Sequence, residues 1–543
     1  MKKLLSIVMV LAMLLSLAAC GETKPAEQPS STTPEPAVND GPKEITATIP
    51  LTGWDLSPFG ADTGSRYITW NNVYDVLCAR VHFGDDVEDL EMDIAKDVKI
   101  SEDGLTAEIE IYDYVKDSKG NAITAKDVEE CYNYAITLGG RSTFTLVKQF
   151  MESIEATGDY TLTLKLKKVS AGAMATCLSV IPICNWEWFN TADDVEKTTN
   201  PACTGPYYIS DMVMDSYITM SKADYWQTDE SLRTYMAKQP FDTINYKLIS
   251  EASMRTAALE KKEVDTADIS AVDMTFFMNE DGTPKEGYTI HQYAGGGYNA
   301  LMFNCAPGKS PLADNKELRQ AIAYAINSRE VMYGADQTDA TAHVLKDFCD
   351  NIAGDYLDKW NDEEYYEQDM DKAKELFEKS GYKPGELKLV LQIMNVGSYN
   401  SAATVIQSEL KDLGIDVEIK AYDLALFATY KMDFTQWDLL MDSYSTKGYL
   451  TDGWNRIDHG DRNGVQDDHL QELFENAMYN HTDEDLDAFH QYLKEQCYAI
   501  GLYANNSFQV AQDKVTKMAL DGLGRINVPA FEIADDYATV VAK

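Results

Sequence analysis

The stretch LKLVLQIMNVGSYNSAATVIQSELKDLGIDVEIK, residues 387–420, decides the fold class of this chain. Apolar residues alternate along 387–393, which predicts a strand, and they recur at helical spacing along 402–413. Gly414 marks the end of that helix, and 415–420 predicts the next strand. A strand, a helix and a strand with short connections form a βαβ unit, whose strands are parallel with a right-handed crossover. We therefore expect an α/β fold.

Outward from this unit, the same periodicities predict further elements. Residues 372–380 and a segment running from a cap at Asp314 or Asn315 to Ile326 are expected to be helices. Strict alternation predicts strands at 106–111 and 161–167. Between these strands, Thr124 and Asp127 form a capping-box pattern at the start of a helix.

The N-terminal segment is typical of secretion. A basic start is followed by an apolar run to Ala19, which is shorter than the roughly 20 residues of a membrane span. Leu17-Ala18-Ala19-Cys20-Gly21 resembles the lipobox of bacterial lipoproteins, in which the Cys20 thiol would carry the lipid. We expect residues 1–20 to be a lipoprotein signal peptide. An ordinary signal peptide or an uncleaved anchor is the alternative.

Residues 21–43 are rich in Pro, Ser, Thr, Glu and Ala, so this segment has little to bury and is expected to be a flexible tether. The remaining chain, about 500 residues, exceeds what one core usually supports and predicts two or three domains. The formal net charge of -42 argues against a nucleic-acid partner, because a polyanion is repelled. It leaves the lipid anchor as the expected contact with the membrane.

The sequence offers no template for catalysis or metal binding. It contains no G-x-S-x-G elbow, no H-E-x-x-H motif and no two histidines three or four residues apart. We therefore expect no catalytic residue, no cofactor and no metal site. Eight cysteines besides Cys20 show no disulfide framework; Cys177 and Cys184, with Cys203 nearby, are compatible with a bridge or with buried free thiols.

Several segments in order resemble family 5 of the extracellular solute-binding proteins, which includes oligopeptide, dipeptide and nickel binders. Thr204-Gly205-Pro206-Tyr207 matches the family's "TGPY" motif, and the segment Lys222-Ala223-Asp224-Tyr225-Trp226 is similar to its "N-x-x-YW" motif. Leu318-Arg319-Gln320-Ala321-Ile322 lies in the segment that resembles the family's "RQAI" helix.

The resemblance implies a two-lobed fold like that of type II periplasmic binding proteins, of the large class with an extra subdomain, mixed sheets and a hinge between the lobes. Lobe I would be discontinuous, from 44–75, 205–296 and 505–543, and would carry an inserted subdomain at 76–204. Lobe II would be 297–504. The crossings near residues 297 and 505 would form the hinge, with ligand enclosed between the lobes.

The resemblance also implies which residues face the ligand. The candidates are polar or aromatic residues in the stretches that correspond to the family's cleft: Asp62, Arg66, Tyr67, Asp268, Tyr298, Asn299, Asp442, Tyr444, Asp452, Trp454 and Tyr503. Peptide-binding members place an Asp, which holds the ligand's ammonium group, near the position of Lys447 here. Either Asp442 or Asp452 takes over that role, or the ligand lacks an ammonium.

These observations lead to one main hypothesis. The chain is expected to be a monomeric, lipid-anchored substrate-binding component of an ABC importer on the outer side of the cell membrane. It would capture a small polar solute, most readily a peptide, and deliver it to the membrane permease. The alternatives are a secreted enzyme acting in the same cleft, such as a glycosidase, and a ligand-sensing receptor that is not coupled to transport.

Overall fold

The fold is that of a computed structural model of the chain. It describes residues 42–534 except 51–53, 61–71, 81–89, 139–141, 171, 225–233, 235–237, 280, 352, 354, 446–462 and 521–525. In this part of the chain, no helix is both long enough and apolar enough to cross a membrane.

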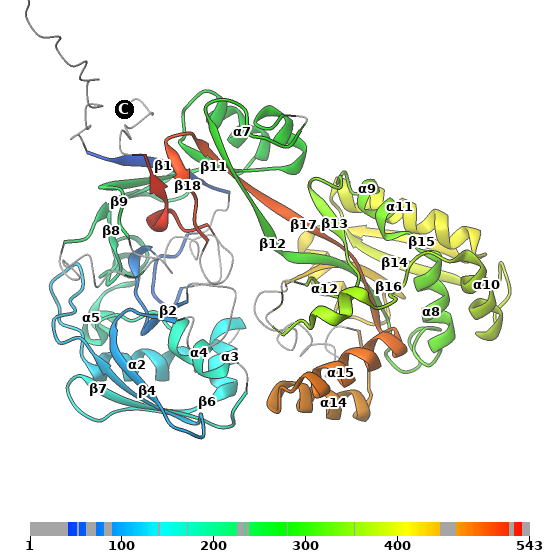
Figure 1. The fold of residues 1–543 in the computed structure, drawn as a ribbon, viewed down its shortest axis with the longest axis horizontal. Coiled ribbons are helices and arrows are strands. Elements are labelled where there is room, and N and C mark those ends of the chain that lie inside the picture. Colours follow the sequence, from blue (N-terminus) through cyan, green and yellow to red (C-terminus); the bar gives the residue numbers. More distant parts are fainter. Residues whose placement is uncertain are drawn as a thin grey trace, which may run out of the picture. The chain divides into compact units, whose positions relative to one another are not determined.

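The largest sheet has eleven strands, in the order β15-β14-β16-β12-β17-β11-β1-β10-β9-β8, with β13 also paired to β17 (Figure 1). Its strands are β1 (Glu44–Ile49), β8 (Tyr207–Val213), β9 (Tyr217–Lys222), β10 (Thr243–Leu248), β11 (Thr266–Ile269), β12 (Tyr288–Phe303), β13 (Ala342–Val344), β14 (Lys388–Met394), β15 (Asp416–Tyr422), β16 (Leu439–Ser445) and β17 (Ala499–Gln512). The long strands β12 and β17 pair antiparallel over most of their length.

The βαβ unit predicted from residues 387–420 is present. Strands β14 and β15 pair in parallel, and helix α11 (Gly397–Asp412) connects them. Gly414 has a φ of +90°, and a Cβ there would lie 2.6 Å from Pro384 Cβ, so only glycine fits this helix end. Helix α11 begins five residues before the expected start, because residues 397–401 are helical without contributing to the apolar periodicity.

Helices cover this part of the sheet. They are α8 (Lys316–Ala325), α9 (Ser328–Gly334), α10 (Met370–Lys379), α12 (Leu424–Tyr430), α14 (Asp468–Tyr479) and α15 (Asp483–Gln496). Asn315 caps α8 by accepting a hydrogen bond from the Leu318 N–H, which settles the choice between Asp314 and Asn315. The buried apolar side chains of residues 298–504 form one cluster.

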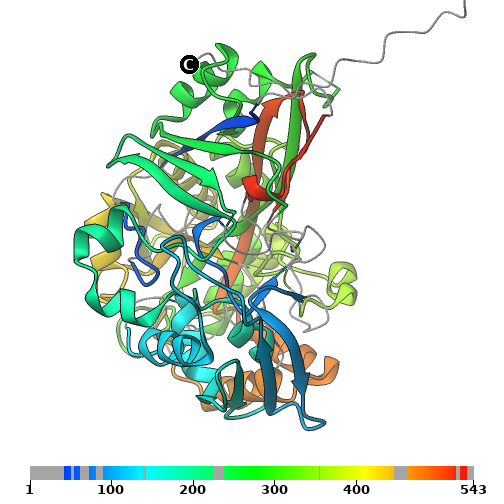
Figure 2. The same ribbon diagram turned by 90° about the vertical axis from the view of Figure 1, so that its left-hand side faces the viewer.

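A second, smaller sheet has the order β4-β5-β7-β6 and is antiparallel throughout. Its strands are β4 (Ala95–Ile100), β5 (Thr106–Ile111), β6 (Met151–Ala156) and β7 (Thr161–Leu166). Helix α2 (Ala125–Ala135) has the predicted capping box, formed by Thr124 and Asp127. Both predicted strands and the helix between them are confirmed; Figure 2 shows this region from the side.

The remaining elements are short. They are β2 (Cys78–Arg80), β3 (Leu90–Met92), α3 (Ser142–Phe150), α4 (Ala173–Ser179), α5 (Trp186–Thr191), α6 (Asp194–Thr199), α7 (Ala252–Glu260), β18 (Val515–Lys517) and β19 (Glu532–Ile533), with 3-10 turns at Ala271–Phe276, Asp358–Asp362 and Val528–Ala530. Buried residues between Ile45 and Tyr246 join residues of 511–531 in a cluster of their own. Strand β17 contributes buried residues to this cluster, to the cluster of 298–504 and to a small third one.

Candidate ligand-binding site

Three neighbouring strands bring five of the candidate residues together. In the order β16-β12-β17, Tyr298 pairs with Tyr444 and Ala504, and Asn299 pairs with Ser443 and Tyr503. Cross-strand partners point to the same side of a sheet, and successive residues point to opposite sides. The candidates therefore lie at one place along the sheet but on both of its faces.

On one face, a phenol and an amide form the centre of the site. The hydroxyl of Tyr399, in the first turn of α11, donates a hydrogen bond of 2.8 Å to Asn299 Oδ1. Burial and the nearby Asp442 carboxylate raise the pKa of Tyr399, so the phenol stays neutral and remains a hydrogen-bond donor. Ser443 is exposed on the same face, which gives this polar group a route to solvent.

On the opposite face, Asp442 is already paired within the chain. Its Oδ2 accepts a 2.9 Å hydrogen bond from the Lys431 ammonium, and its Oδ1 accepts one of 2.8 Å from the Ser443 N–H. The Asp442 side chain is only 11% exposed. An ammonium group of a ligand would therefore have to displace Lys431 to use this carboxylate.

The aromatic candidates differ in what they can offer a ligand. Tyr298 and Tyr503 are 3% and 1% exposed, so their rings pack inside the protein and have little free surface for stacking. Tyr444 is half-buried, and its ring centroid lies 5.9 Å from that of Tyr298. Among the tyrosines predicted on these three strands, Tyr444 is the least buried.

Asp268 lies elsewhere. On β11 it is opposite Gln509, and its carboxylate accepts a 2.8 Å hydrogen bond from Arg255. The predicted residues Cys20, Asp62, Arg66, Tyr67, Lys447, Asp452 and Trp454 lie outside the described residues.

The sequence interpretation missed Tyr399, Lys431 and Ser443. Tyr399 had a usable signal, because it follows the carboxyl end of β14, and ligands of open α/β sheets bind at that end of the strands. Lys431 had no such signal, because nothing in the sequence around it distinguishes it from a lysine that is exposed to solvent.

A cavity of about 900 Å³ is lined by residues between Asn327 and Gln368, and none of the described candidate residues is among them. Its walls include Arg329, His343, Lys346 and Glu363. Strand β13, which carries His343, pairs with β17 from Tyr503 to Asn505, so the cavity adjoins the same stretch of β17. The Asp350 carboxylate accepts a 3.2 Å hydrogen bond from His343 Nε2, which raises the pKa of His343. The described residues contain no group of three or more side chains suited to hold a metal ion.

Comparison with known proteins points to one family. The sequence profile of bacterial extracellular solute-binding proteins, family 5, matches residues 89–457. The oligopeptide-binding protein AppA of Bacillus subtilis is 22% identical over 454 residues, which cover 80% of this chain and 78% of AppA.

Solved structures share the fold. AppA from Bacillus subtilis in complex with a nonapeptide superposes with a TM-score of 0.68 at 18% identity, covering 91% of this chain and 100% of AppA. NikZ from Campylobacter jejuni in complex with Ni(L-His) superposes with a TM-score of 0.69 at 18% identity, covering 89% of this chain and 97% of NikZ. The expected α/β fold with mixed sheets, of the periplasmic-binding-protein type, is thereby confirmed.

Proposed function

This chain belongs to family 5 of the bacterial extracellular solute-binding proteins, and on that premise we propose that its ligand is a peptide. It is the substrate-binding protein of an ABC transporter, and the family is one of binding proteins without catalytic activity, so the alternative of a secreted glycosidase is set aside. The peptide proposal concerns the ligand only. It rests on the polar group around Asn299.

The observation that carries the proposal is the hydrogen-bonded pair of Asn299 and Tyr399 beside the exposed Ser443. Amide and hydroxyl groups both donate and accept hydrogen bonds, as the N–H and C=O groups of a peptide backbone require. Neutral donors and acceptors also bind without a counter-charge, so the site tolerates variation in the ligand's side chains. The peptide complex of AppA, which has the same fold, supports this choice of ligand.

We also propose the division into lobes I and II with the inserted subdomain at the boundaries expected from the sequence. The two crossings, near residues 297 and 505, fall within β12 and β17. The pairing of these strands shifts register between Ala294 and Tyr298, where the sequence is Gly295-Gly296-Gly297. A glycine run within an interrupted ladder has the freedom that a hinge requires.

The proposed attachment to the membrane is a lipid on Cys20, followed by the tether at 21–43. Replacing Cys20 by Ser should release the protein into the medium or leave it unprocessed. Cell fractionation with immunoblotting checks this outcome. Mature protein of the Cys20→Ser variant that stays with the membrane would contradict the lipid anchor and leave the ligand proposal untouched.

The ligand proposal is tested with purified mature protein. Thermal shift is measured against di- to pentapeptides, oligosaccharides, opines and nickel-histidine complexes, followed by calorimetric titration of any solute that stabilises the protein. A ligand at 100 times its Kd stabilises the folded state by about 2.7 kcal/mol, which raises the melting temperature visibly. Stabilisation by peptides alone supports the proposal.

Two outcomes of this screen would contradict the proposal, the first its ligand and the second its site. One is stabilisation by a nickel complex or a sugar with no response to any peptide. The other is a peptide response that is unchanged in the Tyr399→Phe and Asn299→Ala variants, since a ligand bound elsewhere would not depend on that pair. Leu426→Ala, an exposed position on α12, is the matched control.

A further inference from the structure

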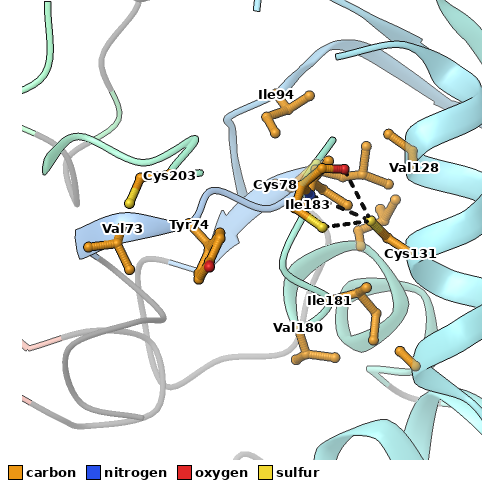
Figure 3. Close-up of a cluster of buried hydrophobic side chains, with 14 of the residues drawn as sticks. Val73, Tyr74, Cys78, Ile94, Val128, Cys131, Val180, Ile181, Ile183 and Cys203 are labelled. Atoms are coloured by element: carbon orange, nitrogen blue, oxygen red, sulfur yellow. Dashed lines mark hydrogen bonds between the residues drawn. The ribbon is translucent and has the colours of Figure 1, made fainter. Parts of the chain in front are cut away.

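Two buried cysteines meet in the region of the smaller sheet. Cys131 of α2 (Figure 3) and Cys184, two residues before α5, have their sulfur atoms 3.8 Å apart. The Cys131 sulfur also lies 3.5 Å from both the carbonyl oxygen and the amide nitrogen of Cys184. Both side chains are fully buried.

The backbone holds the two thiols at this distance. One turn before Cys131 on the same face of α2, Asp127 Oδ1 accepts a 2.8 Å hydrogen bond from the Trp186 N–H. Positions 127 and 131 of the helix thus face positions 186 and 184 of the segment that leads into α5. The approach of Cys131 to Cys184 follows from the packing of two elements and not from a single side-chain rotamer.

Other cysteines of this region make different contacts. The sulfur of Cys78 lies 4.0 Å from Met92 Sδ, and that of Cys203 lies 3.4 Å from the Pro201 carbonyl oxygen. The carbonyl of Cys177 accepts a hydrogen bond from the Tyr132 hydroxyl. The sequence left a Cys177–Cys184 bridge and buried free thiols open; the described cysteines are all buried free thiols in the structure, and the sulfur that approaches that of Cys184 belongs to Cys131.

We propose that Cys131 and Cys184 are joined by a disulfide bond in the exported protein. Closure needs the sulfur atoms to approach from 3.8 Å to about 2 Å. Substrate-binding proteins of this family work outside the cytoplasm, where disulfides form and persist. The proposal depends on that location and not on the identity of the ligand.

The reaction is a thiol-disulfide exchange. One thiolate of the pair attacks the disulfide of an extracytoplasmic oxidant, either a thiol oxidoreductase or a small-molecule disulfide, and forms a mixed disulfide. The second thiolate then displaces the oxidant, which leaves with two thiols. The protein loses two protons and two electrons, and the oxidant gains them.

Exchange has to precede the final packing of this region. Burial raises the pKa of the Cys184 thiol well above its usual range, so the folded protein holds little of the reactive thiolate. The same burial shields the finished bond. We expect reductant to open it slowly in the native protein and rapidly once the protein is denatured.

The test counts thiols in the full-length protein recovered from an oxidising compartment. The protein is denatured in the presence of a maleimide, which labels free thiols, with and without prior reduction. It is then analysed by intact mass and peptide mapping. We expect reduction to expose two additional thiols, and the map to link the peptides that carry Cys131 and Cys184. Equal labelling with and without reduction, or a bridge between other cysteines, would overturn the proposal.

Variants provide a second measurement. Reductant should lower the melting temperature of the wild-type protein. It should do the same for the control variant Cys177→Ala, which replaces a buried cysteine outside the pair. It should leave the melting temperatures of Cys131→Ala and Cys184→Ala unchanged. If these two variants fail to fold, the labelling of the wild-type protein decides alone. Peptide binding is measured in the same samples. The disulfide proposal and the peptide proposal are thereby tested separately, because a negative result for one does not contradict the other.

Discussion

Asp442 and Lys431 show how a single residue pair shapes the site. A carboxylate that is mostly buried must be compensated, and here a lysine of the same chain provides the compensation at 2.9 Å. This internal pair makes Asp442 a poor anchor for the ammonium group of a peptide. The peptide would instead be held through its backbone, which agrees with the neutral groups around Asn299.

Replacing Lys431 by Met removes the partner and leaves the Asp442 carboxylate uncompensated. We expect a loss of about 1.5–3 kcal/mol in the free energy of unfolding, the range for hydrogen bonds to charged groups. The double variant with Asp442→Asn should recover most of this loss, because no charge is then left buried. Urea denaturation of the two single variants and the double variant measures the coupling. Strictly additive losses would mean that the two side chains do not interact.

Asp265 is one of the described residues with a pH signature. Its Oδ2 accepts a 2.7 Å hydrogen bond from the Thr46 N–H, while its Oδ1 is buried and has no hydrogen-bond partner among the residues that the structure describes. Burial raises its pKa from 3.8 to about 6. The folded protein therefore binds a proton that the unfolded chain releases near pH 4.

The sign of the effect follows from this difference. Between pH 4 and 6 the folded state holds more protons at Asp265 than the unfolded state, so its contribution to stability is full below pH 4 and falls as pH rises through 6. The loss is about 1.4 kcal/mol for each unit of pKa difference. Asp265→Asn, which cannot titrate, should lack this slope. Unfolding free energies of wild-type and variant at pH 4, 5, 6 and 7 test it; parallel curves would contradict the assignment.

At the scale of elements, β12 and β17 are the strands in which we propose the hinge between the lobes. Each is a single strand that crosses a proposed lobe boundary, and their ladder is interrupted between Ala294 and Tyr298. Strands that stay paired on both sides of an interruption can bend there without losing their register. The interruption lies beside Asn299, so the proposed hinge and the proposed ligand contact are neighbours along β12.

Gly296→Pro tests the hinge. Proline fixes φ near -65° and should restrict bending, so we expect weaker ligand binding, with a several-fold rise in Kd measured by calorimetry. Glu102→Pro is the control, because Glu102 is the second residue of the turn that the Gly104 N–H closes onto the Ser101 carbonyl, a position that favours proline. Unchanged affinity of a folded Gly296→Pro variant would place the hinge elsewhere.

At the scale of the molecule, the main feature is the large negative net charge. With 89 acidic against 47 basic residues, carboxylates outnumber cationic side chains, and their mutual repulsion opposes the compact state. It also sets the conditions under which the protein is handled. Stability measured at low salt will understate the stability at physiological salt.

Raising NaCl from 10 to 100 mM shortens the screening length from about 30 Å to about 10 Å. We expect the melting temperature to rise by several degrees over this range, and KCl to act equally because screening does not depend on the cation. Calorimetric scans at each salt concentration provide the measurement. A constant or falling melting temperature would show that specific ion pairs outweigh the general repulsion.

The sequence by itself determined the local elements and the family. The βαβ unit of 387–420, the capping box at Thr124 and the strands at 106–111 and 161–167 all follow from periodicity and capping, which act over a few residues. Motifs such as Thr204-Gly205-Pro206-Tyr207 identified the family without any knowledge of contacts. Local patterns were sufficient because the physical causes are local.

Only the tertiary structure decided how the site is composed. Tyr399 reaches Asn299 across one hundred residues of sequence, and the register of β16, β12 and β17 decides which face each candidate occupies. It also decided that Lys431 compensates Asp442 and that the sulfur atoms of Cys131 and Cys184 lie 3.8 Å apart. These pairings depend on the burial of whole faces of helices and sheets. That burial is a property of the packed chain, and no local pattern records it.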